Sequence, residues 1–346
     1  MILERTCHIL MNSGGLQLIF HIMALLVCAV VIYLACELFV NAVEWLGVRL
    51  KMGTIAIGTV LAAIGTALPE SVVTLVAVTM GKSMHSKDIG VGAAMGGPLA
   101  LATIAYGVSG YMLLSKKRGP NPLKELDLAQ LPKDQKWFLS IFIFKVALGL
   151  VAFTFKPWLG LLFFAAYVAY FIKEMRVDSE KHSDMNLEPL KFQPKRAVPS
   201  GLAVAAQTIG ALIVIFISSQ LFVGQLEWVG PKLGLSATVT ALLLSPVATE
   251  LPEIMNAIIW IRQGKVSLAL ANISGAMMIQ ATVPSGLGIL FTPWKFDGPL
   301  ILSGVVTIVS ILYLLMLFRI KKFEPYRLSA AGVFYGIFAI GLILMT

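Results

Sequence analysis

Long hydrophobic stretches, separated by short polar or Pro/Gly-containing segments, run along the whole chain. A helix needs roughly 20 apolar residues to cross a bilayer, and most of these stretches approach that length. The first one is too long for the apolar part of a typical signal peptide and has no evident cleavage site, so we interpret it as a retained helix. The pattern predicts ten membrane-spanning helices, at 16–47, 54–80, 88–114, 137–155, 158–173, 200–229, 236–261, 266–291, 298–318 and 327–345.

The composition agrees with a membrane protein. Of the 346 residues, 58% are hydrophobic and only 13% are charged, and the mean hydropathy is +0.86. A soluble domain carries about 25% charged residues. Half of that fraction cannot cover a water-facing surface, which excludes a soluble enzyme, a nucleic-acid-binding module and a disordered regulator. The expected fold class is therefore an all-α polytopic membrane protein.

The net charge of +9 is best interpreted through the loops, because Lys and Arg accumulate on the cytoplasmic side of membrane proteins. With the N-terminus outside, twenty of the 27 basic residues fall on the cytoplasmic side and six on the other. This bias predicts that both termini lie outside a cell (inner) membrane and that the number of spans is even. The basic loop 115–136 and the polar segment 174–199 are candidates for regulation, or solvated loops attracted to anionic lipid.

The two halves of the chain resemble each other when one is shifted by 183 positions. Glu44-Trp45 then falls on Glu227-Trp228, and Leu68-Pro69-Glu70 falls on Leu251-Pro252-Glu253. Each half contains five predicted spans, and an odd number makes the second half enter the membrane from the opposite side. We therefore expect two inverted-topology five-helix repeats, with a binding site at their interface near the midplane. Their predicted bounds are 1–173 and 200–346, with 174–199 as a cytoplasmic linker.

Three carboxylates lie inside apolar spans at corresponding places in the two halves: Glu70 in the first, and Glu250 and Glu253 in the second. An acidic side chain at the bilayer centre costs roughly 2.5–3.5 kcal/mol even on the lenient insertion scale. Three such groups are expected to face one another, water or a cation. Glu250 and Glu253 are three residues apart and share one helical face.

Prolines next to these carboxylates are expected to free backbone carbonyl groups, because proline lacks the donor for the bond to the residue four positions earlier. Pro69 would free the carbonyl of Gly65, and Pro252 that of Ala248. Unsatisfied backbone at this depth should line a cavity. Carbonyl oxygens beside carboxylates are ligands for a hard cation. The hydroxyl groups of Thr66 and Thr249 either add further oxygens or bond back to their own helix.

Closely spaced carboxylates cannot all remain ionised without a cation. Bound Ca²⁺, Na⁺ or H⁺ would each offset the repulsion. Competition among these ions for one set of carboxylates is the physical basis of exchange.

At these motifs the sequence resembles the cation/calcium exchanger superfamily, in particular its bacterial sodium/calcium exchanger-like branch. The resemblance rests on Gly-Thr-Ala-Leu-Pro-Glu at 65–70 and Ala-Thr-Glu-Leu-Pro-Glu at 248–253 and extends over both halves. It implies ten helices, alternating access, and antiport of Ca²⁺ or another cation against Na⁺ or H⁺. It also implies that Glu70 and Glu253 coordinate the ion.

The chain departs from the family pattern in several places. The motif serine is replaced by Ala67 in the first half and by Glu250 in the second. The second block of the first half, from Gly92 to Pro98, has lost nearly every side-chain oxygen, whereas the second half keeps Asn272 and Gln280. Ca²⁺ alone takes six to eight oxygens. The smaller donor set favours a cation/H⁺ exchanger or a simplified Na⁺-coupled exchanger.

Two other functions remain open at this point: a membrane-embedded metal-dependent enzyme and a non-transporting scaffold. No catalytic metal motif supports the enzyme. We expect no cofactor, inorganic cations and the lipid bilayer as partners, and no nucleic acid. The sequence does not decide between a monomer and a homo-oligomer.

Three charged residues outside the motif also call for an interpretation. Lys145 lies near one end of the fourth span, and we expect its side chain to snorkel to the interface. Glu44 and Glu227 are expected near opposite membrane faces, as simple interfacial charges or as guards of an ion entrance.

Overall fold

The computed structural model describes residues 13–79, 84–115, 130–177, 187–232, 234, 242, 243, 246, 249–320 and 324–345. Ala248 lies outside this part, as do the side chains of Glu70 and Glu227 within their helices. The regular secondary structure in the described residues is helical throughout. The helices of the first half are α2 (Ser13–Arg49), α3 (Thr54–Ala56), α4 (Ala63–Thr79), α5 (Met84–Ala100), α6 (Tyr106–Ser115), α7 (Leu131–Leu150) and α8 (Gly160–Val177).

The second half begins with a long helix, as the first does. Its helices are α9 (Gly201–Lys232), α12 (Leu251–Arg262), α13 (Val266–Phe291), α14 (Gly298–Arg319), α15 (Pro325–Ser329) and α16 (Ala331–Met345). Within the described residues, seven helical segments are long and apolar enough to cross a membrane. Much of the predicted span 236–261 lies outside the described residues, so the number of ten spans stays a prediction.

The fourth predicted span was placed too far along the chain. We predicted 137–155, but α7 begins at Leu131 and ends at Leu150. Pro132 occupies the first turn, where its missing N–H costs nothing, and the helix continues through polar residues that a hydropathy criterion excludes. The chain then runs through residues without helical structure before the short 3₁₀ turn η3 (Lys156–Leu159).

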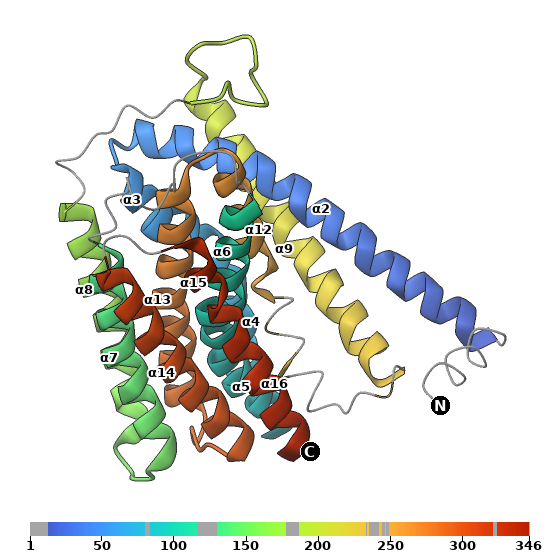
Figure 1. Ribbon diagram of the computed structural model, residues 1–346, viewed down its shortest axis with the longest axis vertical. Coiled ribbons are helices and arrows are strands. Elements are labelled where there is room, and N and C mark those ends of the chain that lie inside the picture. The colour runs from blue at the N-terminus through green and yellow to red at the C-terminus, as the bar shows by residue number, and fades with distance from the viewer. Residues whose placement is uncertain are drawn as a thin grey trace.

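The helices pack as a bundle with two long helices along one side. Figure 1 shows α2 and α9 side by side and slanted, whereas α13 runs through the middle of the other helices. Nearly every residue of α13 is buried. In contrast, α2 exposes large apolar side chains such as Phe20, Leu26 and Val30, which is the surface that lipid requires.

Two short π-helical segments interrupt the helices of the first half. They are η1 (Ile57–Ala62), which leads into α4, and η2 (Leu101–Ala105), which joins α5 to α6. Such segments are often found at functional sites. Segment η1 packs closely on α13, because an ideal Cβ on Gly275 would lie only 2.1 Å from the carbonyl oxygen of Thr59.

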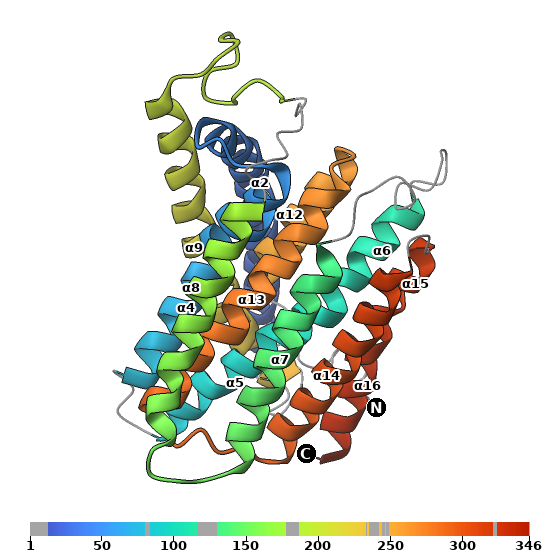
Figure 2. The ribbon, with the colours of Figure 1, turned by 90° about the vertical axis from the view of Figure 1, so that its left-hand side faces the viewer.

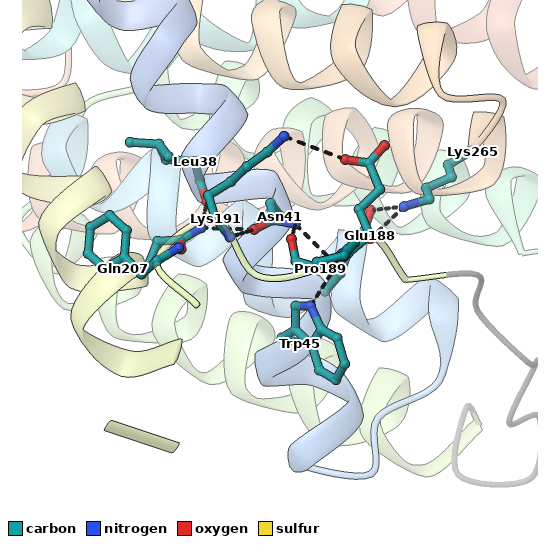
Figure 3. A network of polar contacts seen from close by, with 10 residues as sticks. Leu38, Asn41, Trp45, Glu188, Pro189, Lys191, Gln207 and Lys265 are labelled. Carbon is teal, nitrogen blue, oxygen red and sulfur yellow. Dashed lines mark hydrogen bonds and ion pairs between the residues drawn. The ribbon is translucent and has the colours of Figure 1, made fainter. Parts of the chain in front are cut away.

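The described part of the linker forms hydrogen bonds with both long helices, α2 and α9 (Figure 3). The amide of Asn41 on α2 donates to the carbonyl of Pro189 at 3.2 Å, and its oxygen accepts from the backbone of Lys191 at 3.0 Å. On α9, Gln207 donates to Asn41 at 3.0 Å and accepts from the backbone of Phe192 at 2.8 Å. These bonds hold α2, α9 and residues 189–192 together at one end of the bundle.

At the same end, Glu44 joins α2 to the connection between α12 and α13. Its carboxylate lies 2.5 Å from the Lys265 ammonium and accepts a hydrogen bond from the Trp260 indole at 2.8 Å. Glu44 is only 2% exposed. It is therefore a buried, paired carboxylate, and the expectation of a simple interfacial charge was wrong for this residue.

Removing the ammonium from this pair is expected to destabilise the protein. Lys265→Gln would leave the buried Glu44 carboxylate without its counter-charge, a change that costs about 3 kcal/mol in free energy of unfolding. The measurement is thermal or denaturant unfolding in detergent. Lys191→Gln is the matched control, since Lys191 lies 3.9 Å from Glu188 and both side chains are about half exposed. Equal losses in the two variants would contradict the role of the Glu44–Lys265 pair.

Candidate cation-binding site

Two of the predicted carboxylates lie at the beginning of α12. Glu250 is the residue that precedes the helix, and Glu253 lies in its first turn. Both are almost completely buried, with exposures of 0% and 1%. Pro252 lies in the first turn as well, so it begins a helix instead of bending one. The end of the helix thus places two acidic groups inside the bundle.

Glu250 meets residues from both halves of the chain. The amide nitrogen of Gln280, on α13, donates to Glu250 Oε1 at 2.8 Å. Gly97, on α5, lies directly beside them, because an ideal Cβ there would fall 2.6 Å from Glu250 Oε1 and 2.8 Å from Gln280 Oε1. The absence of a side chain at Gly97 is therefore what leaves room for these polar groups.

The helix α2 approaches the same place. Cys36 is fully buried, and its thiol lies 3.8 Å from the carbonyl oxygen of Pro252, the residue before Glu253. A displacement of α2 relative to α12 would consequently change the surroundings of Glu253.

The predicted threonines do not turn toward these carboxylates. Thr66 donates to the carbonyl of Ala62 at 3.2 Å, and Thr249 donates to that of Pro246 at 3.2 Å. Both hydroxyl groups bond back to their own chain, one of the two possibilities that the sequence left open. Gly65 packs against α2 and α9, since its ideal Cβ would meet Phe39 at 2.8 Å and Leu212 at 3.2 Å.

Sequence reasoning missed Asn256 as a candidate. Asn256 follows Glu253 by three residues on α12 and is fully buried, as is Asn272 on α13. Neither side-chain amide has a hydrogen-bond partner among the described residues. An unsatisfied amide is costly in an apolar interior. The spacing Glu250, Glu253, Asn256 along one helical face was the signal that could have identified it.

Lys145 does not snorkel, so that prediction was wrong. Its side chain is fully buried, and its ammonium donates to the carbonyl of Ala94 at 2.9 Å and to Ser285 at 3.1 Å. It also lies 4.5 Å from the centroid of the Phe142 ring. The three contacts hold the amino group of Lys145 inside the bundle. Its partners lie on α5 and α13, the helices that supply Gly97 and Gln280.

The arrangement offers carboxylate and amide oxygens in a buried place. Such oxygens suit a hard cation or a proton. In the part of the chain that the structure describes, no group of three or more His, Cys, Asp and Glu residues is placed to hold a metal ion.

Comparisons with known proteins identify the family. The model of the sodium/calcium exchanger protein family matches residues 20–173 and 203–346. The inner membrane protein YrbG of Escherichia coli (strain K12) is 27% identical over 282 residues, covering 78% of this chain and 80% of its own length. The putative antiporter CaxA of Alkalimonas amylolytica is 24% identical over 303 residues, covering 86% and 89%.

Solved structures of the sodium–calcium exchanger NCX_Mj have the same fold. The crystal soaked with 10 mM Na⁺ and zero Ca²⁺ aligns with a TM-score of 0.71 at 20% identity, over 92% of this chain and 98% of the other. Because the family model covers most of the chain, the protein belongs to the sodium/calcium exchanger family and is a multi-pass integral membrane protein, a secondary cation antiporter and not an enzyme.

Proposed function

We propose that this antiporter exchanges Ca²⁺ or another cation for H⁺ or Na⁺ by alternating access, and that Glu253, Glu250 and Glu70 bind the ions. The observation that carries the proposal is the burial of Glu250 and Glu253 beside Gln280 and Gly97. Two carboxylates at this depth repel each other unless a cation or a proton joins them. Glu70 enters through its place in the repeated motif, and its side chain is outside the described residues.

The donor set favours a proton as the counter-ion. The threonine hydroxyls bond to their own chain, and the first half contributes Gly97 where an oxygen-bearing side chain would add a ligand. Several Na⁺ ions would need more oxygens than these residues supply, whereas a proton needs one carboxylate. The proposed set of cation-binding groups also includes the side chains of Thr66, Thr249 and Gln280 and the backbone carbonyls of Gly65 and Ala248. Ala248 lies outside the described residues.

The proposed topology places two repeats of opposite orientation in a cell (inner) membrane, with both termini outside. In Figures 1 and 2 the end of α2, the linker and the turn between α12 and α13 lie at one end of the bundle. The connection between α7 and α8 and the end of α16 lie at the other. The first group carries more basic residues than the second, which supports its assignment to the cytoplasm. The description of YrbG as an inner membrane protein supports the same location.

An ion-replacement assay tests the function. Purified protein in liposomes should accumulate Ca²⁺ only when a proton or Na⁺ gradient of opposite direction is present, and the proton gradient should be the more effective. Flux that depends only on Na⁺ would contradict the proton as counter-ion. No flux for any cation would contradict exchange itself.

The absence of a side chain at Gly97 gives a prediction that tests the site itself. Gly97→Ala would place a methyl group 2.6 Å from Glu250 Oε1, so the carboxylate or the Gln280 amide must move. We expect exchange to fall by at least about tenfold, the effect of about 1.4 kcal/mol at the site. Gly224→Ala, on α9, is the control, because nothing lies within 4 Å of its ideal Cβ. Unchanged exchange in Gly97→Ala would exclude Glu250 and Gln280 from the ion path.

A further inference from the structure

A second buried acidic pair lies away from α12. Asp134, at the beginning of α7, is 0% exposed, and Glu174, near the end of α8, is 2% exposed. Both helices lie beside α13 (Figure 2). The Gln130 amide nitrogen lies 3.2 Å from Asp134 Oδ1 and 2.5 Å from Glu174 Oε1, so one donor holds the two carboxyl groups close together.

Hydroxyl groups from the central helices complete the contacts. Ser274, on α13, lies 3.3 Å from Asp134 Oδ2, and Thr59, in η1, lies 3.5 Å from Glu174 Oε2. A serine hydroxyl can donate to a carboxylate or accept from a protonated carboxyl group. Ser274 is therefore compatible with either state of Asp134.

Two other polar side chains are buried in the same region. The Gln135 amide donates to Tyr106 at 3.0 Å, but its Oε1 atom has no partner in the described part of the chain, and neither has the Tyr170 hydroxyl. Both residues are only 1% exposed. An amide oxygen only accepts hydrogen bonds. The Gln135 amide oxygen and the Tyr170 hydroxyl are therefore buried polar groups that would gain from a hydrogen-bond partner.

The charged groups around Asp134 are Glu174 and Lys173, of opposite sign. Among the described residues no basic nitrogen lies within 4.0 Å of its carboxyl group, and Lys173 has its ammonium over the Trp137 ring, 5.2 Å from the centroid. Glu174 adds a negative charge of its own. The titratable groups that face Asp134 are Tyr106 on α6 and Tyr170, Lys173 and Glu174 on α8, whereas α13 and η1 supply only hydroxyl groups.

We propose that Asp134, with Gln130, Gln135, Tyr170 and Ser274 around it, is a proton-binding site separate from the acidic groups of α12. The bound proton lets Asp134 stay beside Glu174 in the dry interior, where two negative charges would repel each other. Ser274 adjoins Gly275, at the closest approach of α13 to η1. Loss of the proton would therefore put a negative charge on Asp134, next to α13.

Linkage gives the proposal a measurable signature. An aspartic acid in an unfolded chain is ionised above about pH 4. The folded protein then holds one proton more than the unfolded chain, so its stability falls as the pH rises, with the unfolding equilibrium constant growing about tenfold per pH unit. This dependence of stability on pH ends at the pH at which the folded protein also releases the proton.

The test compares the full-length protein with Asp134→Asn, an uncharged replacement of similar shape. Thermal unfolding in detergent between mildly acidic and alkaline pH should lose the one-proton slope in Asp134→Asn, and the variant should match or exceed wild-type stability at alkaline pH. The contribution of Asp134 to the infrared band of protonated carboxyl groups should be lost in parallel. A variant destabilised equally at every pH, or an unchanged band, would overturn the proposal.

A second variant keeps the test decisive if Asp134→Asn does not fold. Glu174→Gln removes the neighbouring charge, so Asp134 should release its proton at a lower pH than in the wild type. Glu188→Gln, on the half-exposed linker, should leave the titration unchanged. Repeating the titration with Na⁺ present should give the same curve. Displacement of the proton by Na⁺ would show a metal-cation site and overturn the assignment.

Discussion

Glu253→Gln is expected to abolish cation exchange while leaving the protein folded. The glutamine amide keeps the size of the side chain but removes its charge, so the site loses a carboxylate that offsets the cation. Removing one partner of a buried charge pair costs about 3 kcal/mol, which corresponds to at least about a hundredfold loss of exchange. The readout is Ca²⁺ uptake into liposomes driven by a proton gradient.

Two comparisons show whether the loss belongs to the site. Glu188→Gln removes an acidic group from the half-exposed linker and should keep normal exchange. The unfolding temperature of Glu253→Gln should be at least that of the wild type, because the neutral side chain no longer repels Glu250. Near-normal uptake by Glu253→Gln would remove this residue from the ion path.

Gly275→Ala is expected to produce the largest loss of stability. Its methyl group would lie 2.1 Å from the Thr59 carbonyl oxygen and 2.6 Å from the carbonyl carbon, both of which are backbone atoms. A side chain can rotate away from a clash, but here η1 and α13 must separate. Overpacking of this kind costs about 3 kcal/mol or more.

Gly210→Ala, on α9, is the matched control, because nothing lies within 4 Å of its ideal Cβ. An alanine in a helix interior is about 1 kcal/mol more favourable than glycine, so this variant should be at least as stable as the wild type. The measurement is thermal unfolding of both variants in the same detergent. Equal unfolding temperatures would contradict the close packing of η1 on α13.

Hydrophobic patterning predicted the helical class and many helix bounds well. The predicted span 266–291 coincides with α13, and 298–318 falls within one residue of α14, because Pro and Gly mark the ends of these helices. Patterning did not predict η1 or η2, since a π-helical turn leaves no signal in the order of apolar and polar residues.

The site was predicted in part. The repeated Pro-Glu motif identified Glu250 and Glu253 as carboxylates within an apolar region, and Gln280 was named from its place in the second block. Their mutual geometry could not be derived, because it depends on how α5, α12 and α13 pack. Hydropathy gives the depth of a residue but not the direction in which it faces, which is why Lys145 was expected at the interface and is buried instead. The pairing of Glu44 with Lys265, 221 residues apart, is a tertiary contact of the same kind.

Equilibrium binding of Ca²⁺ to purified protein is the most direct test of a site shared by the two halves. Wild type, Glu70→Gln and Glu253→Gln should be titrated in detergent at constant pH, with Glu188→Gln as the control. If carboxylates from both halves hold one cation, each of the two site variants should bind at least about a hundredfold more weakly. Wild-type affinity in Glu70→Gln, together with lost binding in Glu253→Gln, would contradict a shared site and confine the ion to the second half.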